Sequence, residues 1–500
     1  MGGVSATFPS RLPGWAAALL TFVAAAGVLV LEIAAGRLLA PFVGVSLTTY
    51  TGIIGVILAG IALGAWLGGR AADRLGPERL IGPTFAAGGL AAIASVPIVD
   101  GVGSLALGGE FGGIVVLAAA GFVLPATILS AVGPMIVRAS LTDLGTSGAL
   151  VGRLSAIATA GAISGTFLTG FVLLGLVPTR PLIAGVGTLL VGVGAVSAWG
   201  LGRRRSAALL GLVGVIASAA LIAAAGPSPC LRESAYYCVA ITPDRASPNG
   251  RTLVLDRVRH AYVDLGDPSV LRFRYVRWLV DASAPVIEAR GDDVDVLHVG
   301  GGGFSLPRHL ESAYPVSRHT VLEIDPVVLA TAGSELGFAP TERTTVIVGD
   351  ARLSVHALPT DGYDLVVGDA FGGLSVPWHL TTREFLLQID RLMRPDGRYL
   401  MNIIDGDALR FARAETATLR TVFEHVVVIA NGPPLRGPAG GNLVLVGSHQ
   451  PIDADDILAR IRARGDGGEV LSLPADLAAF TAGTPILTDD FAPVDQLLGR

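Results

Sequence analysis

Long apolar stretches fill the first half of the chain, and short apolar runs fill much of the second half. A helix needs about 20 apolar residues to cross the hydrocarbon core of a bilayer. The first 225 residues contain seven such stretches, so we predict a multi-pass α-helical membrane domain over residues 1–225. The predicted spans are residues 14–40, 48–68, 80–99, 112–138, 150–176, 181–200 and 206–225.

Arginine residues predict the orientation of these spans. They gather in alternate loops, and loops rich in Lys and Arg are typical of the cytoplasmic side of a membrane. Seven spans then place everything after residue 225 outside the cytoplasm. The arginines in these loops are Arg70, Arg74, Arg79, Arg138, Arg153, Arg203, Arg204 and Arg205.

Two cysteines, Cys230 and Cys238, follow the last predicted span. An oxidising compartment would let them close a short disulfide loop. Two unrelated buried thiols are the alternative, and an error of one span would invert the topology and make the disulfide improbable.

Two features within the spans predict packing. Glu32 is a charge in an apolar span, so it should face the bundle interior and find a partner such as Arg37, with a cation or polyamine contact as the functional alternative. Gly161 and Gly165 lie four positions apart in the fifth span, which permits another helix to approach closely.

Composition agrees with a membrane domain and argues against two other classes of protein. Hydrophobic side chains make up 51% of the chain and charged ones 15%, and the mean hydropathy is +0.62, outside the range of ordinary soluble chains. A net charge of -5 without a basic cluster argues against nucleic-acid binding. Two cysteines without a second pair at ligand spacing give no structural zinc site, and we expect no metal.

The second half has the composition of a globular domain. Residues 251–265 alternate apolar and polar side chains and predict a small β subdomain within a linker region at 226–280, with a helix around 270–282. From residue 294, short apolar runs alternate with helical stretches, which predicts a doubly wound, mainly parallel Rossmann-like sheet within residues 281–500. The predicted strands are "VDVLHV", "HTVLEI", "TTVIVG", "YDLVVGDA", "GRYLMNII", "HVVVIA" and "NLVLVGS".

Candidate site residues follow four successive strands of this sheet. Gly300 to Gly303 follow the first, and Glu323 ends the second, 21 residues after Gly302, at the spacing of an acid that binds ribose hydroxyls. Asp350 and Asp369 close the next two. A tight connection and helix capping are the structural alternatives, but the series favours a ligand crevice at one sheet edge.

These motifs, "GGGG", "EID", "GDA" and "YDLVVGDA", resemble the spermidine synthase (polyamine aminopropyltransferase) family, a branch of the S-adenosylmethionine methyltransferase-like fold. The loop "GRAADRLGPERL" at residues 69–80 resembles the loop between the second and third helices of the major facilitator superfamily, which implies half of such a transporter. With "GPMIVRAS", "ATAGAISGTFLTGFVLLG", "VPWHLTTREF" and "LTDDFAPVDQLL", the whole chain resembles fused facilitator-like and spermidine synthase-like membrane proteins of bacteria.

The resemblance implies roles for individual residues. Asp369 would be the catalytic carboxylate and contact the amine, beside Tyr275. The residues expected to hold decarboxylated S-adenosylmethionine or S-adenosylmethionine are Gly300, Gly301, Gly302, Glu323 at the ribose, Asp350 at the adenine, Ala351, and His260 in place of a glutamine. Putrescine or a related polyamine and the lipid bilayer are the expected partners, and the oligomeric state stays open, a homo-oligomer included.

Two departures from the family pattern bear on the chemistry. The family loop reads Gly-Gly-Gly-Asp-Gly-Gly, whereas this chain has Gly303, Phe304 and Ser305 at the last three positions, and Gly372 replaces a second Asp. Both changes remove negative charge from the expected amine site. An S-adenosylmethionine-dependent methyltransferase and a non-catalytic nucleoside- or polyamine-binding transporter or sensor are therefore the alternatives to an aminopropyltransferase, and His379 is an alternative base.

Overall fold

The computed structural model describes residues 12–105, 111–432 and 440–498. The chain divides into two compact units, Met1–Cys238 and Val239–Arg500. The first unit is helical, and the second contains the parallel strands that carry the predicted site residues.

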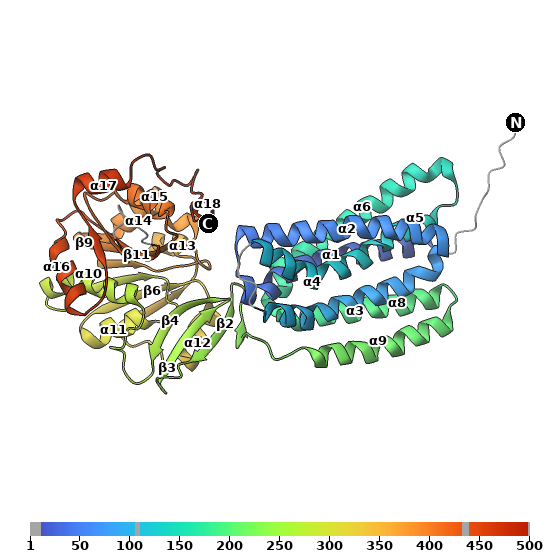
Figure 1. Ribbon diagram of the computed structural model, residues 1–500, viewed down its shortest axis with the longest axis horizontal. Coiled ribbons are helices and arrows are strands. Elements are labelled where there is room, and N and C mark those ends of the chain that lie inside the picture. Colours follow the sequence, from blue (N-terminus) through green and yellow to red (C-terminus); the bar gives the residue numbers. More distant parts are fainter. Residues whose placement is uncertain (1–11, 106–110, 433–439, 499–500) are drawn as a thin grey trace. The chain divides into compact units, whose positions relative to one another are not determined.

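Long apolar helices make up the first unit. Seven helical segments in the described residues are long and apolar enough to cross a membrane, which confirms the predicted set of long apolar helices. Helix α1 packs against α6, α2 against α4, and α3 against α8 (Figure 1). The elements are α1 (Gly14–Val43), α2 (Leu47–Leu75), α3 (Pro77–Gly103), α4 (Phe111–Ser130), α5 (Val132–Ser140), η1 (Leu144–Thr146), α6 (Ser147–Leu168), η2 (Thr169–Leu173), α7 (Leu174–Leu176), α8 (Thr179–Gly200) and α9 (Arg204–Ala224).

Two glycines allow α6 to lie directly on α1. A Cβ atom added to Gly161 would lie 2.4 Å from the carbonyl oxygen of Phe22, and one added to Gly165 would lie 2.6 Å from that of Ala26. Any side chain at these positions would separate the helices, which confirms the predicted close approach.

The prediction that Arg37 pairs with Glu32 is wrong. The Arg37 guanidinium instead donates hydrogen bonds to the carbonyl oxygens of Ser234 and Tyr236, at 2.5 and 2.6 Å. Residues five positions apart point about 140° away from each other around a helix, so the two side chains leave α1 on different faces. The two acceptor carbonyl groups belong to the segment that follows α9.

That segment is closed by a disulfide and is fixed to the helical unit at one further point. Cys230 and Cys238 are joined by a disulfide. The Glu233 carboxylate accepts hydrogen bonds from the backbone N–H and the hydroxyl of Thr179, at 2.8 and 2.7 Å, at the start of α8.

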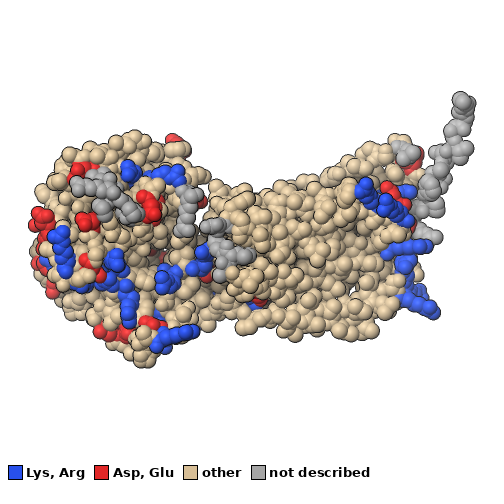
Figure 2. Space-filling model, in the orientation of Figure 1, with Lys and Arg blue, Asp and Glu red and all other residues tan. Residues whose placement is uncertain are grey.

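Charged side chains are distributed unevenly over the helical unit. Figure 2 shows sides almost without charge and a group of basic side chains at one end. Arg138 at the end of α5 lies 3.5 Å from Asp73 near the end of α2, so these two helix ends are neighbours. An apolar flank with a basic end is typical of helices that cross a membrane.

The predicted β subdomain lies largely in the second unit, although its first strand and the first residue of its second strand belong to the first unit. Strands β1 (Arg232–Glu233), β2 (Cys238–Pro243), β3 (Gly250–Leu255) and β4 (Val258–Asp264) follow one another in a four-stranded sheet, in which β2, β3 and β4 pair antiparallel. Helix α10 (Arg274–Ala289) confirms the helix expected after them.

The main sheet has eight strands in the order β12-β10-β11-β9-β8-β5-β6-β7. All seven predicted runs form strands, and the five from β9 to β7 in this order are parallel. The remaining neighbours, β9 and β11, β11 and β10, and β10 and β12, pair antiparallel, so β11 and β12 run opposite to the other strands of the sheet. The strands are β5 (Asp295–Val299), β6 (Arg318–Glu323), β7 (Thr344–Val348), β8 (Tyr363–Gly368), β9 (Met393–Asp405), β10 (His425–Ala430), β11 (Gly441–Ser448) and β12 (Glu469–Leu471).

Helices cover both faces of this sheet (Figure 1), and strands such as β8 are buried throughout. Helices α10, α11 and α16 share one core cluster, and α14, α15 and α17 share the other. The helical elements that follow α10 are α11 (Ser305–Ala313), α12 (Pro326–Glu335), α13 (Ala351–Ser354), η3 (Val355–Ala357), η4 (Trp378–Leu380), α14 (Arg383–Leu392), α15 (Arg410–Leu419), α16 (Ala454–Ala463), α17 (Pro474–Phe480) and α18 (Val494–Leu497).

The strand order fixes the place of a ligand site. From β5 the chain proceeds to β6 and β7 on one side, then returns to β8 and β9 on the other. Ligands of such sheets bind outside the carboxyl ends of the strands at this switch point. The ends of β5 and β8, with Gly300 and Asp369, lie there.

Candidate nucleoside and amine site

The glycine turn after β5 requires glycine for two reasons. Gly300 has φ +103° and Gly302 has φ +50°, in the region that side chains disfavour. A Cβ atom on Gly300 would also lie 2.5 Å from the carbonyl oxygen of Asp369. The turn therefore brings bare backbone against the end of β8.

Glu323, at the end of β6, fixes the glycine turn through hydrogen bonds. Its Oε2 accepts hydrogen bonds from the backbone N–H groups of Gly301 and Gly302, at 2.9 and 3.0 Å, and its Oε1 accepts from that of Asp325 at 2.9 Å. Burial raises the pKa of the Glu323 carboxyl, although these three donors oppose the shift. The carboxylate thus fixes the shape of the turn, and its contact with a ribose stays a prediction.

Asp350 and Ala351 lie at the start of α13, beyond β7. The Asp350 carboxylate accepts from the backbone N–H of Leu353 at 3.3 Å and lies 3.2 Å from Nε2 of His379. The alternative base His379 therefore lies beside Asp350, and neither lines the cavity that contains Asp369. The adenine contact of Asp350 and Ala351 also stays a prediction.

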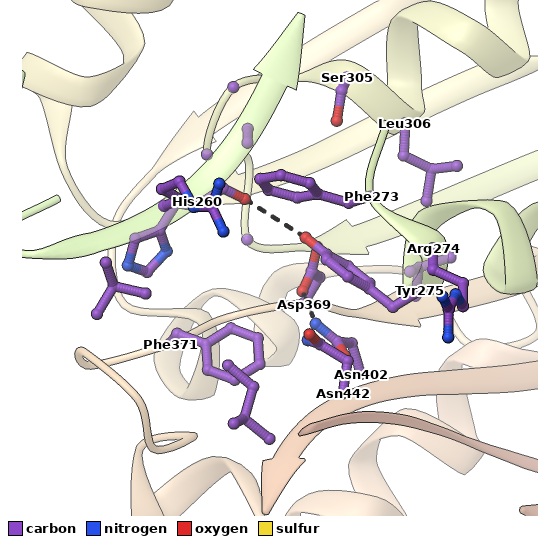
Figure 3. Close-up of a pocket in the computed structure, with 18 of the residues that line it drawn as sticks. His260, Phe273, Arg274, Tyr275, Ser305, Leu306, Asp369, Phe371, Asn402 and Asn442 are labelled. Atoms are coloured by element: carbon purple, nitrogen blue, oxygen red, sulfur yellow. Dashed lines mark hydrogen bonds between the residues drawn. The ribbon is translucent and has the colours of Figure 1, made fainter. Parts of the chain in front are cut away.

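A cavity of about 440 Å³ lies at the carboxyl ends of β5 and β8. Four predicted features line it together: the glycine turn, His260 from β4, Tyr275 from α10, and Asp369 (Figure 3). Residues from the β subdomain and from the main sheet thus meet around one space. Glu323 adjoins this space through its hydrogen bonds to the turn.

Asp369 is the carboxylate at the base of this cavity. Its Oδ1 accepts a hydrogen bond from Nδ2 of Asn402 at 2.8 Å, and its Oδ2 accepts from the Tyr275 hydroxyl at 3.3 Å (Figure 3). Burial raises the pKa of Asp369 to about 6, against the opposing effect of these two donors. The group is therefore mostly ionised at neutral pH and able to accept a proton.

Asn402 and Asn442 complete this network, and neither was predicted from the sequence. Nδ2 of Asn442 donates to Oδ1 of Asn402 at 3.1 Å, which directs the Asn402 amide N–H toward Asp369. Asn402 interrupts the apolar run "LMNII", and Asn442 begins the apolar run "NLVLV". That exception in the pattern was the available signal.

His260 is a neutral residue of the cavity wall. Burial lowers the pKa of its imidazole to about 4, and its backbone carbonyl oxygen accepts from the Tyr275 hydroxyl at 3.4 Å. Its ring meets that of Phe371 edge-on, with centroids 6.4 Å apart. A neutral imidazole suits packing and hydrogen bonding better than attraction of an anion.

Three arginines that were not predicted as site residues also line the cavity. They are Arg259 on β4, Arg272 before α10, and Arg274 at the start of α10. Asp369 is the one carboxylate among the described residues that line this cavity.

No family model matches this chain. The chain is 38% identical over 130 residues to the polyamine aminopropyltransferase of Vibrio vulnificus, a stretch that covers 26% of this chain and 43% of that protein. It is 30% identical over 131 residues to the eEF1A lysine and N-terminal methyltransferase of Danio rerio, covering 24% of this chain and 19% of that protein. Both relatives are transferases, one of aminopropyl groups and the other of methyl groups. The chain spans less than half the length of either relative.

A crystal structure of a probable spermidine synthase from Corynebacterium glutamicum is also similar, with a TM-score of 0.49 and 27% identity. The match covers 54% of this chain and 99% of that one. The resemblance of residues 69–80 to the major facilitator superfamily stays a prediction.

Proposed function

We propose that the protein is a membrane-anchored transferase that moves an alkyl group from a sulfonium nucleoside to an amine. In the aminopropyltransferase form of this reaction the donor is decarboxylated S-adenosylmethionine and the acceptor is an amine such as putrescine. The observation that carries the proposal is Asp369, a half-buried carboxylate in a cavity directly beside the glycine turn.

The chemistry needs such a carboxylate. An alkylamine has a pKa of about 10, so at neutral pH its nitrogen is protonated and has no free electron pair. Asp369 attracts this cation and accepts its proton. The nitrogen pair then forms the new N–C bond while the C–S bond breaks, and the electrons of that bond stay on sulfur. The sulfonium leaves as a neutral thioether and needs no acid.

The sheet edge offers a place for the nucleoside. The backbone of Gly301 and Gly302 allows a ligand to approach closely, and Glu323 adjoins them. Asp350 ends the neighbouring strand, where an adenine amino group could donate to it. We assign the ribose to Glu323 and the adenine to Asp350 and Ala351.

Methyl transfer is the second candidate. Gly303 and Gly372 lack the carboxylates that the family uses near the amine, and one of the curated relatives is a methyltransferase. A methyltransferase would use undecarboxylated S-adenosylmethionine and ignore diamines.

The seven long apolar helices support a place in a membrane. The basic end of the helical unit would face the cytoplasm (Figure 2). An odd number of crossings would then put the second unit outside the cytoplasm, where the disulfide between Cys230 and Cys238 is stable.

The test uses the full-length protein in detergent micelles. It is incubated with each sulfonium donor and with putrescine, and mass spectrometry detects alkylated amine together with methylthioadenosine or S-adenosylhomocysteine. Asp369→Asn should abolish turnover of the amine but leave donor binding intact. Donor binding without any turnover would favour the non-catalytic alternative, and no binding of either donor would overturn the proposal.

A further inference from the structure

The electrostatics of the cavity do not suit a diamine. Arg259, Arg272 and Arg274 line it with exposed guanidinium-bearing side chains, and Asp369 supplies the one carboxylate among its described lining residues. A protonated diamine would bring two more positive charges to a space that already holds more cations than anions. Like charges that share a site repel each other, so a dication suits this cavity less well than a ligand with a negative group.

The arginines are only partly neutralised by their neighbours. Arg272 lies 3.7 Å from Oδ2 of Asp244 and stacks over the ring of Tyr262. Arg274 donates from Nη1 to Oδ1 of Asn431 at 3.0 Å, a neutral partner. Arg259 forms no ion pair within the described part of the chain. Two of the three positive charges are therefore available to a ligand.

Packing explains why this chain cannot accommodate an aspartate at position 303. A Cβ atom on Gly303 would lie 2.5 Å from Cβ of Ala261 on β4. The hairpin that carries Arg259 thus occupies the position that a carboxylate at residue 303 would need. The close approach of the hairpin excludes the acid next to the glycine turn and adds an arginine to the same cavity.

We propose that one of the two substrates in this cavity carries a carboxylate, and that Arg259 and Arg274 bind it. Guanidinium groups match the planar geometry of a carboxylate and form charge-assisted hydrogen bonds with it. This inference rests on the proposed function and names its substrate class. The carboxylate has two sources, the α-carboxylate of an undecarboxylated sulfonium donor or that of an amino acid whose side-chain amine is the acceptor. The bonds formed and broken at nitrogen, carbon and sulfur are the same in both cases.

Two matched pairs of ligands separate these sources. S-adenosylmethionine differs from decarboxylated S-adenosylmethionine only by a carboxylate, and ornithine differs from putrescine in the same way. Binding of each donor to the full-length protein is measured by calorimetry, and binding of each amine is measured with methylthioadenosine present. Arg259→Gln and Arg274→Gln are compared with Arg462→Gln, a change at an exposed arginine of α16 outside the cavity.

We expect the carboxylate-bearing member of one pair to bind at least about tenfold more tightly. Both cavity variants should reduce that preference, and Arg462→Gln should keep it. If S-adenosylmethionine binds more tightly than its decarboxylated form, the carboxylate belongs to the nucleoside. If ornithine binds more tightly than putrescine, the carboxylate belongs to the acceptor. If donors bind but neither pair shows a preference, or if Arg259→Gln and Arg274→Gln leave it unchanged, the inference is wrong while the proposed function stands. If no sulfonium nucleoside binds, both are wrong.

Discussion

Asn402 donates a hydrogen bond of 2.8 Å to Asp369, and this bond joins β9 to the loop that follows β8. It opposes the effect of burial on the carboxyl, because a donor to a carboxylate stabilises the charged form. The pKa of Asp369 is consequently about 6 rather than higher. An amide on a neighbouring strand thus keeps the proposed base ionised at neutral pH.

Replacing Asn402 with Ala should therefore raise the pH below which kcat/KM falls. In the native enzyme the rate should fall as the pH drops through about 6, because protonated Asp369 cannot accept the amine proton. Without the Asn402 donor the pKa of Asp369 rises, so kcat/KM begins to fall at a higher pH. At pH 6 we expect kcat/KM to be about tenfold lower than in the native enzyme. The measurement is kcat/KM from pH 5 to 9.

Asn442→Ala is the matched comparison, because Asn442 contacts Asn402 rather than Asp369. In Asn442→Ala the pH below which kcat/KM falls should also rise, but by a smaller amount. A uniform loss of rate at every pH in Asn402→Ala would show that the residue only shapes the cavity.

Gly303 and Gly372 stand where the family has Asp, and we expect these two positions to respond differently when Asp is introduced. A Cβ atom at Gly372 meets nothing closer than 3.9 Å, whereas one at Gly303 would overlap Ala261. Gly372→Asp should fold normally and bind putrescine more tightly, since it adds a negative charge. Gly303→Asp should lower the Tm of the protein. Putrescine titration and thermal unfolding test both, and equal Tm values for the two variants would contradict the packing argument.

Removing the Glu323 carboxylate should weaken nucleoside binding. Glu323→Ala leaves the N–H groups of Gly301 and Gly302 without their acceptor, so the turn loses its fixed shape. Methylthioadenosine should bind at least about tenfold more weakly by calorimetry. Glu342→Ala, at an exposed position, is the control and should bind as the native protein does. Unchanged binding in Glu323→Ala would remove Glu323 from the nucleoside site.

The proposed orientation in the membrane makes a simple prediction for reporter fusions in bacterial cells. Alkaline phosphatase folds only outside the cytoplasm, because it needs disulfides. A fusion after Arg500 should be active, and one after Arg205, in the first turn of α9, should be inactive. The opposite pattern would invert the topology and place the second unit in the cytoplasm.

The strands and the carboxylate could be predicted because both depend on local sequence. Buried parallel strands are short continuous apolar runs, and the strand-end rule then brings Gly300 and Asp369 to one edge. The antiparallel pairing of β10 and β11 was not predicted, since an apolar run has the same appearance in either direction. The arginines were missed for a different reason. Arg259 and Arg274 reach the cavity only because a hairpin and a helix pack onto the sheet. The local spacing of apolar and polar residues does not reveal such packing.

Glu415 on α15 is a buried carboxyl that the proposed reaction does not use. Its side chain has no exposed surface, and neither carboxyl oxygen has a hydrogen-bond partner within the described residues. Burial raises its pKa well above the usual range of a glutamate. The group is therefore held in the neutral form in the folded protein.

A raised pKa makes folding stability depend on pH. Below the pKa of the unfolded chain Glu415 is protonated in both states, and as the pH rises only the unfolded state releases the proton, so stability falls until the folded-state pKa is reached. Glu415→Gln cannot ionise and should remove this loss, about 1.4 kcal/mol for each pH unit within that interval. We expect the Tm of Glu415→Gln relative to the native protein to increase from pH 5 to pH 8, while Glu342→Gln shows no such trend. Parallel Tm curves for Glu415→Gln and the native protein would mean that the carboxyl ionises at its ordinary pKa inside the fold.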